Sequence, residues 1–99
     1  MAKSYDEIVS DISNHIRKYG GEFSDYYCGI TNDAKRRLFD EHNVEKDRGV
    51  WIYRTANSDS VAREVEKYFL VAGCKGGSGG GSDDCTIVYC YKITKKTVQ

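Results

Sequence analysis

The chain lacks three features that would place it in a class at once: an excess of charge, a long apolar run and paired cysteine motifs. Its 99 residues carry 15 basic and 15 acidic side chains, so the formal net charge at pH 7 is zero. This balance argues against a protein that binds nucleic acid purely by its overall charge, but it leaves room for a local basic patch. No apolar run approaches the roughly 20 residues of a membrane-spanning helix, and the N-terminal region lacks the apolar core of a signal peptide. We therefore expect a soluble protein with no membrane partner, in the cytoplasm or associated with the nucleoid.

Four cysteines are present, and none of them forms a Cys-x-x-Cys pair. They are Cys28, Cys74, Cys85 and Cys90, and both histidines lie far from them in the sequence. This spacing gives little support to a zinc site, so reduced thiols that act as small apolar side chains are the simpler interpretation.

The length and the apolar pattern predict one α+β domain over residues 1–99, with a small sheet covered by helices. Three segments have the apolar spacing and the preceding cap residues of helices: residues 5–18, 34–42 and 60–71. Three short runs rich in aromatic and β-branched residues predict strands: residues 26–30, 49–55 and 85–93. We expect these strands to form a three-stranded, mainly antiparallel sheet.

Residues 76–82 read GGSGGGS and cannot hold regular structure, which predicts a flexible loop. A phosphate-binding loop is the weaker alternative. The Gly-Lys-Ser/Thr ending of a P-loop is missing, and no helix is predicted to start directly after this stretch.

The stretch YCGITNDAKRRLFDEH, which begins at Tyr27, resembles the second half of the signature of the GIY-YIG nuclease superfamily. In that signature a Tyr-x-Gly strand end is followed by a turn and by a helix that carries an arginine, which is Arg37 here. A further strand and an acidic helix follow in the family, and Glu66 lies four residues after Ala62, a spacing from a small residue to the metal-binding glutamate that is common in the family. The resemblance covers residues 26–70, close to half of the chain.

The first triplet of the family, Gly-Ile-Tyr, has no counterpart before Tyr27, where the sequence reads NHIRKYGGEF. The C-terminal strand reads IVYCYK (87–92) and is similar to the first-triplet strand without its glycine. We hypothesise a permuted GIY-YIG-like arrangement in which this strand neighbours residues 26–30 and places Tyr89 beside Tyr27.

The resemblance implies a metal-dependent endonuclease that hydrolyses phosphodiester bonds in DNA, with nucleic acid as its partner. Arg37 carries a permanently charged, planar group suited to phosphate oxygens. The adjacent Lys35 and Arg36 are further candidates for binding the substrate phosphate. The chain has little beyond a catalytic core, so it would cut with low sequence preference or depend on a targeting protein partner.

Four further residues receive roles from the same resemblance. Glu66 would hold Mg²⁺ or Mn²⁺, and Mg²⁺ keeps most of its waters and needs few protein ligands. Tyr27 would act as the general base, although a free tyrosine with a pKa near ~10 needs nearby positive charge for this role. Tyr89 and His42 would orient water or contact phosphate.

Each of these residues also has a purely structural interpretation. Tyr27 could pack in the sheet, Arg37 could be a solvated helix residue, and His42 could interact with a helix C-terminus. Glu64 competes with Glu66 for the acidic role. The alternative function is a catalytically inactive GIY-YIG-like module that binds nucleic acid or regulates a partner, and a purely structural domain is a third possibility.

Overall fold

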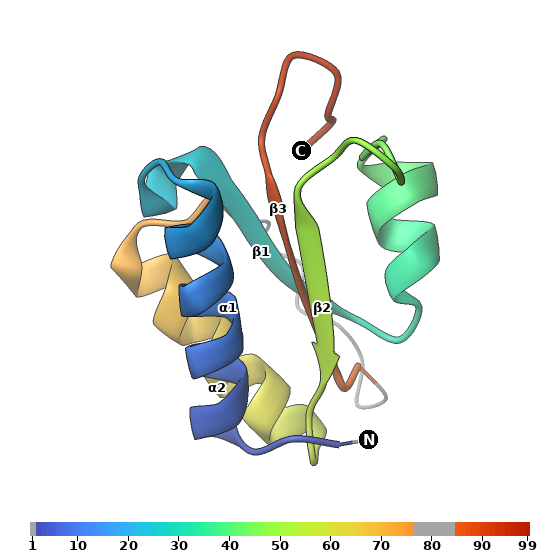
Figure 1. Cartoon of the computed structure of the whole chain (residues 1–99). Coiled ribbons are helices and arrows are strands. Elements are labelled where there is room, and N and C mark those ends of the chain that lie inside the picture. Colours follow the sequence, from blue (N-terminus) through green and yellow to red (C-terminus); the bar gives the residue numbers. More distant parts are fainter. Residues whose placement is uncertain (1, 77–84) are drawn as a thin grey trace.

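The computed structural model describes residues 2–76 and 85–99, and it shows a three-stranded sheet with helical segments on both faces (Figure 1). The strands are β1 (Tyr26–Thr31), β2 (Trp51–Thr55) and β3 (Ile87–Lys92). Their order in the sheet is β1-β3-β2, and β3 is antiparallel to both neighbours. The predicted α+β class and the small antiparallel sheet are therefore confirmed.

The C-terminal strand β3 lies directly beside β1, as the permuted arrangement requires. In the register of the two strands, Tyr27 is opposite Tyr91 and Gly29 is opposite Tyr89. A Cβ atom at Gly29 would lie 2.6 Å from the Tyr89 hydroxyl oxygen. The ring of Tyr89 thus crosses over Gly29, and the absence of a side chain there lets the ring lie flat on the neighbouring strand.

Helix α1 (Tyr5–Tyr19) begins after its N-cap, Ser4, which forms a capping box with Glu7. The helix ends at Gly20, whose φ of 83° is a conformation that other residues rarely adopt. One side of α1 is aliphatic and buried: Ile8, Ile12 and Ile16.

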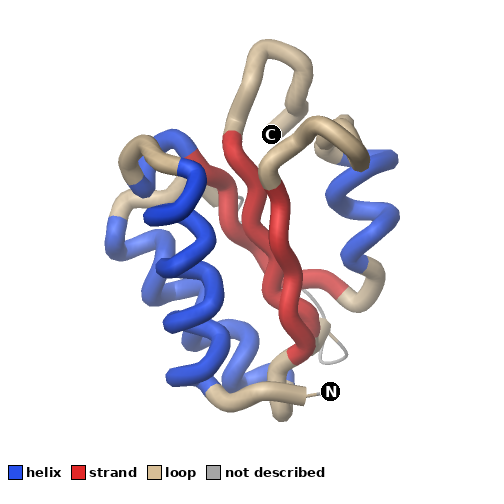
Figure 2. Tube along the Cα trace, viewed as in Figure 1, coloured by secondary structure: helices blue, strands red, loops and turns tan. Residues whose placement is uncertain are grey.

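Helix α2 (Asp59–Ala72) begins after Ser58, whose hydroxyl accepts a hydrogen bond from the backbone N–H of Val61 at 3.1 Å. It packs beside α1 on one face of the sheet (Figure 2). Its buried side chains have the spacing predicted from the sequence: Ala62, Val65 and Phe69.

The other face of the sheet carries η2 (Arg36–Glu41), which is the green helix on the right of Figure 1. A helix was predicted here, but its turns are π-helical rather than α-helical, with a hydrogen bond of 2.8 Å from the His42 N–H to the Arg37 carbonyl. The chain after β3 returns to this helix, because the Val98 N–H donates to the His42 carbonyl at 2.8 Å. The sequence did not predict η1 (Phe23–Asp25), a single turn of 3₁₀ helix before β1.

The two faces of the sheet bury different kinds of side chain. The face under α1 and α2 is mainly aliphatic, although it also buries Tyr26 and Phe69, and it includes the buried side chains of all four cysteines. The face under η2 is aromatic, with Tyr27, Tyr89 and Tyr91 packed against Leu38 and Val44. The alternation of side chains along each strand produces this division.

Two sequence predictions concern other parts of the chain. Within residues 2–76 and 85–99, no helix has both the length and the apolar character to cross a bilayer. The predicted Gly-rich loop, residues 76–82, lies outside the described residues except for Gly76.

Replacing Phe69 by alanine tests how the helix face is packed. Phe69 is fully buried, so Phe69→Ala is expected to lower the free energy of unfolding by about 3–5 kcal/mol. Val71 is on the same helix but is 80% exposed, so Val71→Ala is expected to change stability by less than about 0.5 kcal/mol. Urea unfolding followed by circular dichroism measures both, and equal losses would contradict this packing.

Candidate functional site

Four of the residues predicted from the sequence lie together on the aromatic face of the sheet. Tyr27 comes from β1, Tyr89 from β3, Arg37 from η2, and His42 from the residue that follows η2. Tyr91 joins them, because it lies two residues after Tyr89 and therefore on the same face of β3. We call these five residues the tyrosine–arginine cluster. The sequence analysis did not select Tyr91, although the strand alternation could have identified it.

A chain of hydrogen bonds runs through this cluster. Arg37 Nη2 donates to the Tyr89 hydroxyl at 3.2 Å, and that hydroxyl lies 2.8 Å from His42 Nε2. His42 Nδ1 is 2.6 Å from the Val98 carbonyl oxygen. A carbonyl can only accept, so Nδ1 carries the proton of the neutral ring and Nε2 accepts from Tyr89. The single hydroxyl proton of Tyr89 is therefore directed to His42.

The π-helical geometry of η2 explains how Arg37 and His42 reach the same phenol. They are five residues apart and are joined by the backbone hydrogen bond characteristic of a π-helix. In an α-helix, residues five apart point in different directions, and only those three or four apart are neighbours. The Arg37 side chain also lies over the Tyr89 ring, with its Cζ atom 5.9 Å from the centroid.

Burial shifts the pKa values of the inner members of the cluster. Tyr89 and Tyr91 are fully buried, and this burial raises the pKa of both phenols. Burial likewise lowers the pKa of His42; its hydrogen bond to Val98 opposes this shift, and the charge of Arg37 adds to it. Tyr89 and Tyr91 are thus neutral near pH 7, and both ring nitrogens of His42 are occupied by Val98 and Tyr89, so these inner groups suit a positioning role.

Tyr27 differs from the other two tyrosines in the state of its hydroxyl group. Its ring packs against His42 and Tyr91, with centroid distances of 4.6 and 5.2 Å. The hydroxyl makes no hydrogen bond to any described residue. If its oxygen were fully buried, it would be a buried polar atom without a partner, but among the described residues only His15 Nε2 is such an atom. The small exposed part of Tyr27, 5%, therefore includes its hydroxyl oxygen. Tyr27 presents the available phenol of the cluster.

The positive charge of η2 is partly neutralised by an acidic residue of the same helix. Glu41 pairs with both Arg36 and Arg37. The Arg37 side chain remains 33% exposed, and Lys35 is exposed at the start of the helix. Nη1 of Arg37 pairs with Glu41 and Nη2 is bonded to Tyr89, so a ligand from solvent would meet the remaining N–H groups of the guanidinium.

Glu66 lies on α2, on the aliphatic face of the sheet, and not in the tyrosine–arginine cluster. It is close enough to Cys28, whose side chain points to that face, to contribute to the raised pKa of the thiol after burial and Cys74. Burial raises the pKa of Glu66 itself, and the charge of Arg63 opposes the shift. The competing Glu64 is fully on the surface. The structure thus brings Tyr27, Arg37, His42 and Tyr89 together and leaves Glu66 on the other side of β1.

A divalent cation needs several oxygen, nitrogen or sulfur ligands that converge on one point. In the described part of the chain, no group of three or more His, Cys, Asp or Glu side chains could hold a metal ion. Mg²⁺ often uses only one or two carboxylates besides water and substrate phosphate. Glu66 offers one half-buried carboxylate, which the charge of Arg63 attracts, and it lies on the face of the sheet opposite Arg37 and Tyr27, so it does not fit a metal that acts on the phosphate at Arg37. Within the cluster region, Glu41 is already held by two arginines.

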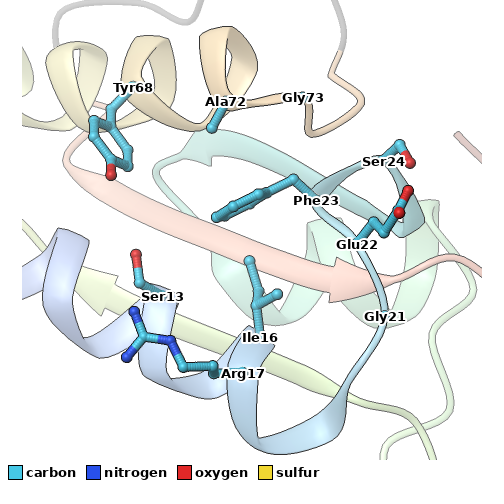
Figure 3. Close-up of a pocket in the computed structure, with 10 residues that line it drawn as sticks. All are labelled: Ser13, Ile16, Arg17, Gly21, Glu22, Phe23, Ser24, Tyr68, Ala72 and Gly73. Carbon is cyan, nitrogen blue, oxygen red and sulfur yellow. The ribbon is translucent and has the colours of Figure 1, made fainter.

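A separate cavity of about 540 Å³ opens between the end of α1 and the end of α2 (Figure 3). Phe23 projects into it from η1, and Arg17 and Glu22 are its charged lining residues. It contains none of the residues predicted from the sequence. It lies on the face of the sheet that α1 and α2 cover, away from the tyrosine–arginine cluster.

Comparison of the chain with protein-family models, with curated proteins and with solved structures finds no match. The relation to the GIY-YIG superfamily therefore stays a resemblance in sequence motif, and the function is argued from the site itself.

The buried state of His42 predicts a pH dependence of stability. Because folding lowers the pKa of His42 below its ordinary value of 6.5, the unfolded chain binds more protons in mildly acidic solution. The contribution of His42 to the free energy of unfolding is therefore fully present above about pH 6.5, and it is lost as the pH falls toward the pKa of the folded state. His42→Gln is expected to flatten this part of the profile, measured by urea unfolding between about pH 7 and pH 5.

His15 serves as the control, because burial also lowers its pKa and it belongs to a different part of the fold. His15→Gln should leave the His42 contribution in place, and the double variant should have the flattest profile. An unchanged slope in His42→Gln would contradict the buried, neutral state of the ring.

Proposed function

We propose that the chain is an endonuclease of GIY-YIG type that hydrolyses phosphodiester bonds in DNA. The observation that carries the proposal is the hydrogen bond from Arg37 to Tyr89 of β3. The ring of Tyr89 packs beside that of Tyr27 on β1, whose hydroxyl is available to a ligand. A phosphodiesterase needs a cation for the phosphoryl oxygens and a group that removes a proton from water. Arg37 and Tyr27 supply these two groups within one cluster.

Arg37 binds the non-bridging oxygens of the phosphate, where negative charge grows during the reaction. Lys35 and Arg36 add positive charge at the same end of η2. Tyr27, in its phenolate form, takes a proton from the attacking water as the new P–O bond forms and the bond to the leaving oxygen breaks. Tyr89 holds the guanidinium of Arg37 in place, and His42 holds Tyr89, so both are positioning residues.

Glu66 is the residue to which the resemblance assigns Mg²⁺ or Mn²⁺. Arg37 and Glu66 lie on opposite faces of the sheet, and Lys75 pairs with the outer edge of β1 at Tyr27. A metal held by Glu66 would therefore not reach the leaving oxygen of a phosphate bound by Arg37, and no step of the proposed reaction depends on it.

A second candidate is an inactive relative that binds nucleic acid or regulates a protein partner. Two observations favour it: Tyr27 is only slightly exposed, and Glu66 makes no contact with the tyrosine–arginine cluster. Such a module would keep Arg37 as a phosphate contact without cutting the bound strand.

Cleavage assays with three variants separate the two candidates. Plasmid and a short duplex are incubated with Mg²⁺ or Mn²⁺ and with the wild type, Tyr27→Phe, Arg37→Ala or Glu66→Gln. Tyr27→Phe and Arg37→Ala are each expected to lower the rate by about 10²-fold or more, because they remove the base and the cation. Glu66→Gln tests the metal role given by the resemblance, and its position on the opposite face of the sheet predicts little change in rate.

Surface residues of the same types provide matched controls: Tyr19→Phe, Arg17→Ala and Glu64→Gln, all at exposed positions. The controls should cut at the wild-type rate. Cutting that survives in all three site variants would defeat the assignment, and binding that weakens with salt in the absence of cutting would favour the inactive module.

A further inference from the structure

A second cavity, of about 370 Å³, lies at the opposite end of η2 from Arg37. Its walls are the loop after η2 and the chain after β3, which meet near the C-terminus at the top of Figure 1. We call it the cationic pocket, and its lining residues are 43–45, 48–49, 92 and 94–97.

The charge of the cationic pocket is strongly one-sided, although the whole chain has no net charge. Its lining includes four cationic side chains and a single carboxylate, Glu45. Glu45 pairs with Lys96 at 2.8 Å. The charge of Arg48 also helps to lower the pKa of Glu45, after the hydrogen bond and the charge of Lys96. Four cationic side chains and one carboxylate leave the lining with an excess of three positive charges.

The walls of the pocket are fixed to each other, so the cations are held near one another before a ligand binds. Asn43 Nδ2 donates to the Lys96 carbonyl at 2.9 Å, and the ion pair between Lys96 and Glu45 crosses the same gap. The loop itself is tight: the Gly49 N–H donates to the Glu45 carbonyl at 2.8 Å, and a Cβ atom at Gly49 would lie 2.5 Å from that oxygen. A pocket already formed costs less entropy to occupy than a loop that must first become ordered.

The pocket is continuous in the chain with the tyrosine–arginine cluster. Asn43 directly follows His42, and Lys92 directly follows Tyr91. The segment that carries Lys95 also supplies the Val98 carbonyl that holds His42. A chain of phosphates that meets Arg37 at one end of η2 can therefore continue toward the pocket at the other end.

We propose that the cationic pocket binds a second backbone phosphate of the nucleic acid whose scissile phosphate meets Arg37; this inference rests on the proposed function. Clustered Lys and Arg side chains bind phosphate without regard to base sequence. The pocket thus gives a chain of zero net charge a local surface for sequence-independent binding of DNA.

The test measures binding of a fluorescein-labelled duplex of about 20 base pairs, and of one of its strands, by anisotropy over a range of salt concentrations. EDTA is present, so the result does not depend on cleavage. The triple variant Arg48→Gln/Lys92→Gln/Lys95→Gln is expected to bind the duplex more weakly. Its slope of log K against log salt should be smaller by about 1, because the loss of one phosphate contact removes about 0.9.

A control variant removes the same charge from exposed positions on the helices: Arg17→Gln/Lys18→Gln/Lys67→Gln. It should keep the wild-type slope, and Lys95→Glu should by itself reduce binding at an exposed site that makes no hydrogen bond with the described residues. Circular dichroism confirms that each variant is folded. Equal slopes in the two triple variants, or no binding by the wild type, would overturn the pocket.

Failure of the proposed function gives a different result. In that case the wild type binds through the pocket but does not cut, or cuts equally well after Tyr27→Phe. If Tyr27→Phe binds normally and does not cut, both the site and the pocket stand. If the triple variant of the pocket cuts and binds normally, the assignment of the tyrosine–arginine cluster stands and the proposed role of the cationic pocket is wrong.

Discussion

The position of the Tyr89 phenol is the constraint on which the rest of the site depends. It accepts a hydrogen bond from Arg37, donates one to His42, and its ring lies over Gly29 of the neighbouring strand. All three contacts require β3 to lie beside β1 in its observed register. A slip of one residue would turn Tyr89 to the aliphatic face and separate it from both η2 partners.

This arrangement joins parts of the chain that are far apart in sequence. β1 and η2 come from the first half, whereas β3 and the segment that ends at Val98 come last. Because His42 bonds to Val98, the C-terminal segment stabilises both the buried ring and one wall of the cationic pocket. The candidate catalytic groups and the candidate phosphate surface are thus parts of one packed unit on the η2 face.

The sequence predicted the elements well, because apolar spacing and caps such as Ser4 and Ser58 are local signals. It also predicted Tyr89 beside Tyr27, from a motif match rather than from periodicity. It could not predict the π-helical turns of η2, because residue types there suit an α-helix equally well. The sequence also could not predict the position of Glu66. Helical spacing places this residue next to the buried Val65, but only the packing of α2 decides which face of the sheet they meet.

The state of the His42 ring is the most direct measure of this account. Long-range ¹H–¹⁵N NMR correlations of the imidazole nitrogens, assigned with the help of His15→Gln, report which nitrogen carries the proton. Near neutral pH we predict a neutral ring with the proton on Nδ1, held by the Val98 carbonyl, and with Nε2 accepting from Tyr89. A ring protonated on Nε2, or one that is doubly protonated at that pH, would contradict the hydrogen-bond chain from Arg37 to Val98.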